Sequence, residues 1–66
     1  MVARYSAVVE QQVTRNELIY TLRKLGLLPN VAQDTVFISC TDPSPELVEK
    51  LDIIFEQFRR HDIERR

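Results

Sequence analysis

Alternating apolar and polar positions predict a first β-strand over residues 4–13. Tyr5, Ala7 and Val9 share one parity, whereas polar residues occupy most of the other parity. Val8 is the apolar exception on the polar side. This alternation is typical of a sheet that buries one face and exposes the other to water.

A change to helical spacing predicts a helix over residues 15–25. Thr14 and Glu17 have the Thr-x-x-Glu spacing of a capping box, which marks a helix start. An apolar stripe follows at helical spacing, made of Leu18, Ile19, Leu22 and Leu25. Gly26 stands where a left-handed residue ends many helices, so we expect this helix to stop there.

The second half of the chain repeats the order of strand and helix. Residues 30–34 are predicted to form a loop, and residues 35–41, rich in β-branched side chains, to form a strand. The Asp-Pro-Ser-Pro run that follows predicts a helix over residues 45–60, with Ser44 as its N-cap. The polar end, residues 61–66, is expected to fray.

These elements predict one small α/β (α+β) domain over residues 1–66, with two layers and the order β-α-β-α. Both helices are expected on one face of the sheet. Because about 20 residues and a helix connect the strands, we expect parallel pairing if the strands pair directly. A two-stranded sheet is marginal in water and has open edges. We therefore expect a homodimer with a four-stranded sheet, and a monomer with another segment between the strands is the alternative.

Composition and charge narrow the classes of function. The chain has 66 residues, 44% of them hydrophobic and 29% charged, and a formal net charge of −1. Nucleic acid is therefore not favoured as the main partner, because proteins that bind nucleic acid usually have a strongly basic face. No apolar run reaches the length of a membrane span and no secretory signal is visible, so we expect a cytoplasmic protein that does not associate with membranes.

Candidate catalytic and metal-binding groups are few. Cys40 is the only cysteine, and it lies on the core-facing parity of its strand, where it is expected to be a small buried hydrophobe. His61 lies in the polar tail, and one cysteine with one histidine cannot build a zinc site. Gly26 is the only glycine, which excludes a glycine-rich phosphate loop. We expect no enzymatic activity, no metal and no cofactor.

Two residues of the strands are candidates for contact with a partner. Val8 and Phe37 are apolar residues on the polar parity of their strands. A large aromatic side chain on a polar sheet face indicates that another surface covers it. Partial cover by long neighbouring side chains is the alternative explanation.

Four residues of the helices are further candidates. Tyr20 falls opposite the apolar stripe of its helix, with Arg23 and Lys24 close by, so that an aromatic ring lies among cations. Ile53 points away from the stripe of the last helix, among charged residues. An amphipathic tyrosine, cations that match the helix dipole, and one ordinarily exposed isoleucine are the alternatives.

The function we expect is that of a small non-enzymatic regulator or inhibitor that docks on a larger protein as a homodimer. One alternative is a nucleic-acid-binding dimer that uses the basic patch of the first helix, namely Arg15, Tyr20, Arg23 and Lys24. Another is a structural subunit of a larger assembly. Salt-sensitive binding to DNA or RNA would distinguish the first alternative, and large or concentration-dependent oligomers would distinguish the second.

Overall fold

Three strands and two helices follow one another along the chain in the order β-α-β-β-α. The structure is a computed structural model that describes residues 1–65. Its elements are β1 (Val2–Val8), α1 (Gln12–Lys24), β2 (Asn30–Ala32), β3 (Thr35–Thr41) and α2 (Pro45–Arg65).

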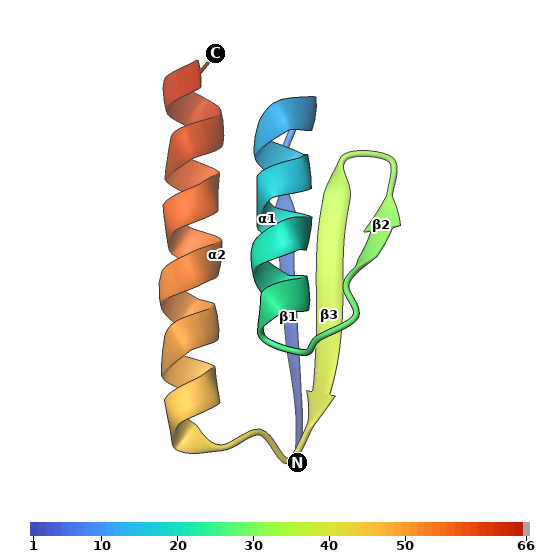
Figure 1. The fold of residues 1–66 in the computed structure, drawn as a ribbon, viewed down its shortest axis with the longest axis vertical. Coiled ribbons are helices and arrows are strands. Elements are labelled where there is room, and N and C mark those ends of the chain that lie inside the picture. Colours follow the sequence, from blue (N-terminus) through green and yellow to red (C-terminus); the bar gives the residue numbers. More distant parts are fainter. Residues whose placement is uncertain (66) are drawn as a thin grey trace.

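The sheet has three antiparallel strands in the order β1-β3-β2, and the two helices form a second layer over one of its faces (Figure 1). β3 lies where the sequence predicts it, with Val36, Ile38 and Cys40 buried. The core consists of Ala7, Val9, Leu18, Leu22, Val36, Ile38, Cys40, Leu51 and Phe55. Because both helices contribute to this single core, the expected two-layer α+β fold is confirmed.

The expected parallel pairing of the two long strands is wrong. β1 and β3 pair antiparallel, from Val2 opposite Thr41 to Val8 opposite Thr35. The helical crossover does exist, but it connects β1 to the short strand β2, which runs in the same direction as β1 (Figure 1). The chain then turns back, and β3 lies between the two.

The loop expected at residues 30–34 contains β2. Its three residues, Asn30–Ala32, are all exposed, so they lack the alternation by which a half-buried strand is recognised. β2 pairs with β3 from Asn30 opposite Phe37 to Ala32 opposite Thr35. The sheet thus acquires a third strand within one copy of the chain.

The junction between β1 and α1 also differs from expectation. β1 ends at Val8, five residues earlier than predicted, and α1 begins at Gln12, three residues earlier. The residue before the helix, Gln11, makes no side-chain capping bond. Thr14 is buried inside the first turn, so the predicted capping box is wrong.

α2 continues to Arg65, so residues 61–64 and the backbone of residue 65 are helical where a frayed tail was expected; residue 66 lies outside the described residues. Asp62 is only 1% exposed. Its carboxylate accepts hydrogen bonds from the backbone N–H groups of Glu10 (3.1 Å) and Gln11 (2.7 Å). The start of α1 is therefore capped by a side chain of α2.

Two helix ends follow the sequence pattern. Gly26 has φ 82°, and the N–H of Leu27 donates to the carbonyl of Leu22 at 3.1 Å, which is a Schellman ending of α1. At the start of α2, the N–H of Leu47 donates to the hydroxyl of Ser44 at 3.2 Å, which confirms Ser44 as the N-cap.

Candidate functional site

One face of the sheet is left without a covering layer, and we call it the outer face. It consists of Val2, Arg4, Ser6, Val8, Asn30, Ala32, Thr35, Phe37, Ser39 and Thr41. Phe37 lies at its centre, between Ser6 of β1 and Asn30 of β2. Val8 lies in the next row, opposite Thr35. The register thus brings the two predicted strand candidates to diagonal positions on one surface.

The outer face combines apolar and uncharged polar groups. Val8 is 54% exposed and Phe37 37% exposed. Arg4 is the only charged residue in the three strands. Hydroxyl and amide side chains surround Phe37, and an aromatic centre with a polar rim is the composition of many protein–protein interfaces.

The second notable surface is the free edge of β1. The N–H of Val9 donates to the carbonyl of Asp34 (2.8 Å), and the carbonyl of Met1 accepts from the N–H of Asp42 (2.7 Å). Odd-numbered residues of β1 therefore direct their backbone groups toward β3 and even-numbered residues direct theirs away from it. The residues that face the free edge are Val2, Arg4, Ser6 and Val8.

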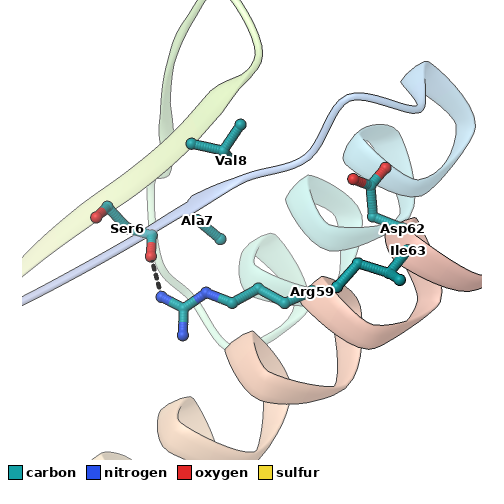
Figure 2. Close-up of a pocket in the computed structure, with 6 residues that line it drawn as sticks. All are labelled: Ser6, Ala7, Val8, Arg59, Asp62 and Ile63. Atoms are coloured by element: carbon teal, nitrogen blue, oxygen red, sulfur yellow. Dashed lines mark hydrogen bonds between the residues drawn. The ribbon is translucent and has the colours of Figure 1, made fainter.

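α2 stands beside this edge, on the side of β1 away from β3 (Figure 1). The guanidinium of Arg59 reaches from α2 to β1 and donates to the carbonyl oxygen of Ser6 (Figure 2). An open pocket of about 400 Å³ lies there, lined by Ser6, Ala7, Val8, Arg59, Asp62 and Ile63. The edge is thus accessible, but one of its carbonyl groups is already engaged.

Tyr5 lies on the helix side of β1 and contacts α2. Its ring stacks on Phe55 with a centroid distance of 5.6 Å. Burial raises the pKa of Tyr5 above its usual 10.0, and the nearby Asp52 carboxylate raises it further. The neutral phenol is therefore the form that this contact favours.

The predicted patch on α1 is only partly assembled. The ammonium of Lys24 lies 5.1 Å from the ring centroid of Tyr20, which is a cation–π contact. Arg23 is exposed in the last turn of the helix. Arg15 instead donates to the carbonyl of Val9 at 2.9 Å, so it stabilises the β1–α1 junction. Fewer cations are therefore left for an anionic ligand than the sequence indicated.

Ile53 is 56% exposed and lies on α2, on the side opposite the buried Leu51 and Phe55. It is therefore remote from the outer face, which belongs to the other side of the sheet. The six predicted contact residues occupy three separate surfaces: Val8 and Phe37 lie on the outer face, Tyr20, Arg23 and Lys24 on α1, and Ile53 on α2.

Sequence reasoning missed Arg59 and Asp62. Asp62 follows Leu51, Phe55 and Phe58 at helical spacing, so an acid on the buried side of α2 was detectable in the sequence. Its partners at residues 10 and 11 were not detectable, because only the packing of α2 against β1 brings them close. The same holds for the contact of Arg59 with Ser6.

The described residues offer neither a cluster of metal ligands nor a membrane-spanning helix. They contain no group of three or more His, Cys, Asp or Glu side chains that could hold a metal ion. None of their helices has both the length and the apolar character of a membrane span. In comparisons with known proteins, no family model, no curated protein and no solved structure matches this chain. Function is therefore inferred from the geometry of the two surfaces alone.

Proposed function

We propose that the protein is a small non-enzymatic binding module that regulates or inhibits a larger protein by docking on it through the outer face. The observation that supports this function best is the half-exposed ring of Phe37 at the centre of an uncovered sheet, with Val8 beside it. Apolar side chains at such positions lose contact with water only when another surface covers them.

The energetics are consistent with this function. Covering the exposed parts of Phe37 and Val8 contributes about 2–3 kcal/mol in total, at the usual value per area. Ser6, Asn30 and Ser39 can donate and accept hydrogen bonds around them. An aromatic side chain at the centre of a polar surface is a typical energetic hot spot of a protein complex.

A second copy is another occupant of the same face, and we propose that the homodimer forms in this way when the larger partner is absent. We also propose a cytoplasmic setting, since a single free and buried cysteine, Cys40, suits a reducing compartment.

The test compares two pairs of variants in an affinity pull-down from a lysate of the source cells, followed by mass spectrometry. Phe37→Thr and Val8→Thr alter the outer face and leave each strand with a β-branched residue that favours strand structure at the changed position. Tyr20→Thr and Ile53→Thr are the matched controls, because these side chains are at least equally exposed but lie on the helices. We expect one partner to be lost from the first pair and kept by the second.

If the first pair retains the partner while a control variant loses it, the outer face is not the docking surface. If the wild-type protein retains no partner above background and binds RNA or DNA at about 50 mM salt, the proposed function is wrong and the nucleic-acid alternative is favoured.

A further inference from the structure

We infer that the free edge of β1, beside α2, takes up an extended segment of a protein partner as a fourth strand, and that this segment carries a carboxylate for Arg59. This inference rests on the proposed function only in that the partner is a protein. The edge consists of the backbone groups of Val2, Arg4, Ser6 and Val8, whose side chains belong to the outer face. A variant of Arg59 therefore tests the edge, and a variant of Phe37 tests the face.

The backbone chemistry of the edge selects an extended polypeptide. The alternation in β1 directs the N–H and C=O groups of Val2, Arg4, Ser6 and Val8 away from β3. These groups match the hydrogen-bonding pattern of one strand of about seven residues, and such strand addition is a common mode of peptide recognition. The opposite edge of the sheet is β2, which has only three residues.

The position of α2 excludes β1 of a second copy as that strand. Antiparallel pairing of two β1 strands would place the helices of both copies on the same side of the joint sheet. α2 contacts β1 and stands on the side of its free edge (Figure 1). The two-fold axis between the paired strands would therefore bring the α2 helices of the two copies into the same space, whereas a single strand without a helix layer avoids this clash.

Arg59 determines the charge that the segment should carry. At present its guanidinium donates to the carbonyl of Ser6, which is a common way to protect a strand edge. A strand that pairs with Ser6 presents its own N–H to that carbonyl and competes with the guanidinium. A carboxylate on the incoming segment would give Arg59 a new, charge-assisted partner.

The open pocket beside Arg59 can receive a side chain of the segment. Its volume is about 400 Å³, and Ala7 and Ile63 provide apolar parts of the wall. Figure 2 shows Arg59 and Ile63 on α2 and Ala7 of β1 on the same side of the strand, whereas the side chain of Val8 points to the other side. We therefore expect a valine-sized apolar residue near the carboxylate.

The experiment uses the full chain, labelled with ¹⁵N, and a synthetic probe peptide, acetyl-Lys-Thr-Val-Thr-Glu-Thr-Val-Thr-Lys-amide. Amide hydrogen exchange is followed by NMR with the peptide at up to about 2 mM, a concentration that detects millimolar affinity. The comparison peptide has glutamine in place of glutamate, which removes the charge and keeps the shape. Arg59→Ala is the test variant, and Arg60→Ala, which removes the same charge from an exposed neighbour, is the control.

We expect the peptide to slow exchange at the amides of Val2, Arg4, Ser6 and Val8, and the glutamine peptide to bind about fivefold more weakly. Arg59→Ala should abolish the difference between the two peptides, whereas Arg60→Ala should preserve it. Ser6→Pro should weaken both peptides while keeping the fold, because the N–H that it removes points away from β3.

Three results would overturn the inference. The first is that amide exchange along β1 stays unchanged at the highest peptide concentration. The second is that both peptides bind the wild-type protein equally well. The third is that, without peptide, the edge amides become more protected as the protein concentration rises. The last result would assign the edge to a second copy. None of the three affects the pull-down that tests the outer face.

Discussion

At the scale of single residues, Asp62 is the most consequential side chain that the sequence pattern did not single out. It lies near the end of α2 and accepts hydrogen bonds from the backbone N–H groups of Glu10 and Gln11, which precede α1. A carboxylate at a helix N-terminus satisfies unpaired N–H groups and interacts favourably with the helix dipole. One buried acid thus joins two segments that are about 50 residues apart along the chain.

Replacing Asp62 should therefore destabilise the whole fold. We expect Asp62→Ala to lower the free energy of unfolding by about 2 kcal/mol, because it leaves two partly buried N–H groups without their acceptor. Asp62→Asn keeps one acceptor oxygen and should cost less. Urea unfolding followed by circular dichroism measures both values. The control is Glu64→Ala at an exposed position, where we expect the free energy of unfolding to change by no more than about 0.5 kcal/mol. Equal effects of Asp62→Ala and Glu64→Ala would contradict the stabilising role of Asp62.

Tyr5 gives a second prediction at this scale. Burial and then the Asp52 carboxylate raise its pKa above 10.0, so the folded chain holds the phenol proton more tightly than the unfolded chain does. The corresponding stability is fully present below pH about 10 and is lost as the pH rises through the higher pKa of the folded state. We expect Tyr5→Phe to reduce this alkaline loss, as measured by urea unfolding between pH 8 and pH 11 at unit intervals. Tyr20→Phe is the control, and an identical pH profile of Tyr5→Phe and the wild-type protein would refute the assignment.

At the scale of elements, the sequence pattern predicts those parts whose determinants are local. β3 and the start of α2 follow from alternation and from the Ser44 N-cap, and the end of α1 follows from Gly26. The start of α1 could not be predicted in this way, because its cap is supplied by Asp62 from the other end of the chain. The Thr14 capping-box spacing was a local signal that the long-range contact overrides.

The strand β2 escaped prediction for a different reason. Its residues contribute no buried side chain, so pairing with β3 alone defines it as a strand. Antiparallel pairing of β1 with β3 depends on this missed strand. β2 forms the edge of the sheet opposite β1, and from there the chain turns back as β3 between the two. Of the candidate site, the placement of Val8 and Phe37 on the exposed face was predictable from parity, whereas the pocket beside Arg59 was not.

The hairpin between β2 and β3 allows a prediction about this element. Ala32 pairs with Thr35, so Gln33 and Asp34 form a two-residue turn, and Gln33 has φ 57°. This left-handed conformation is unfavourable for a residue with a side chain and is readily adopted by glycine. We expect Gln33→Gly to raise the free energy of unfolding by about 0.5 kcal/mol, as measured by thermal unfolding. Gly26→Ala is the reciprocal variant: its φ of 82° predicts a loss of about 1 kcal/mol although open space surrounds the position.

At the scale of the whole molecule, charge is distributed unequally between the two layers. Seven of the ten acidic residues belong to α1 and α2, namely Glu17, Glu46, Glu49, Asp52, Glu56, Asp62 and Glu64. The strands contain a single charged residue, Arg4. The same helices also carry seven cations, so contact between the helix layers of two copies would remove many charges of both signs from water, whereas the outer faces can meet with few charges to desolvate.

This asymmetry leads to a prediction about self-association. Two outer faces in contact would cover Phe37 and Val8 of both copies, but the polar side chains around them limit the affinity. We expect a weak homodimer with a Kd of about 0.1–1 mM, detectable by sedimentation equilibrium near 1 mM protein. Phe37→Thr should give a monomer at that concentration, and Arg59→Ala, which alters the β1 edge without changing a side chain of the outer face, should leave the dimer in place.

The dependence on salt distinguishes this contact from one between helices. If the outer faces meet, Arg4 is the only charged strand residue near the interface. Raising the salt concentration to about 0.5 M screens the repulsion between the two Arg4 side chains. The dimer should therefore stay unchanged or become slightly tighter. The first half of α2 is acidic, and its last turns contain Arg59 and Arg60. If the dimer dissociates at high salt and persists in Phe37→Thr, it is held together by these opposite charges of α2. That outcome would show that the homodimer does not form through the outer face, and the face would then be available for the larger partner alone.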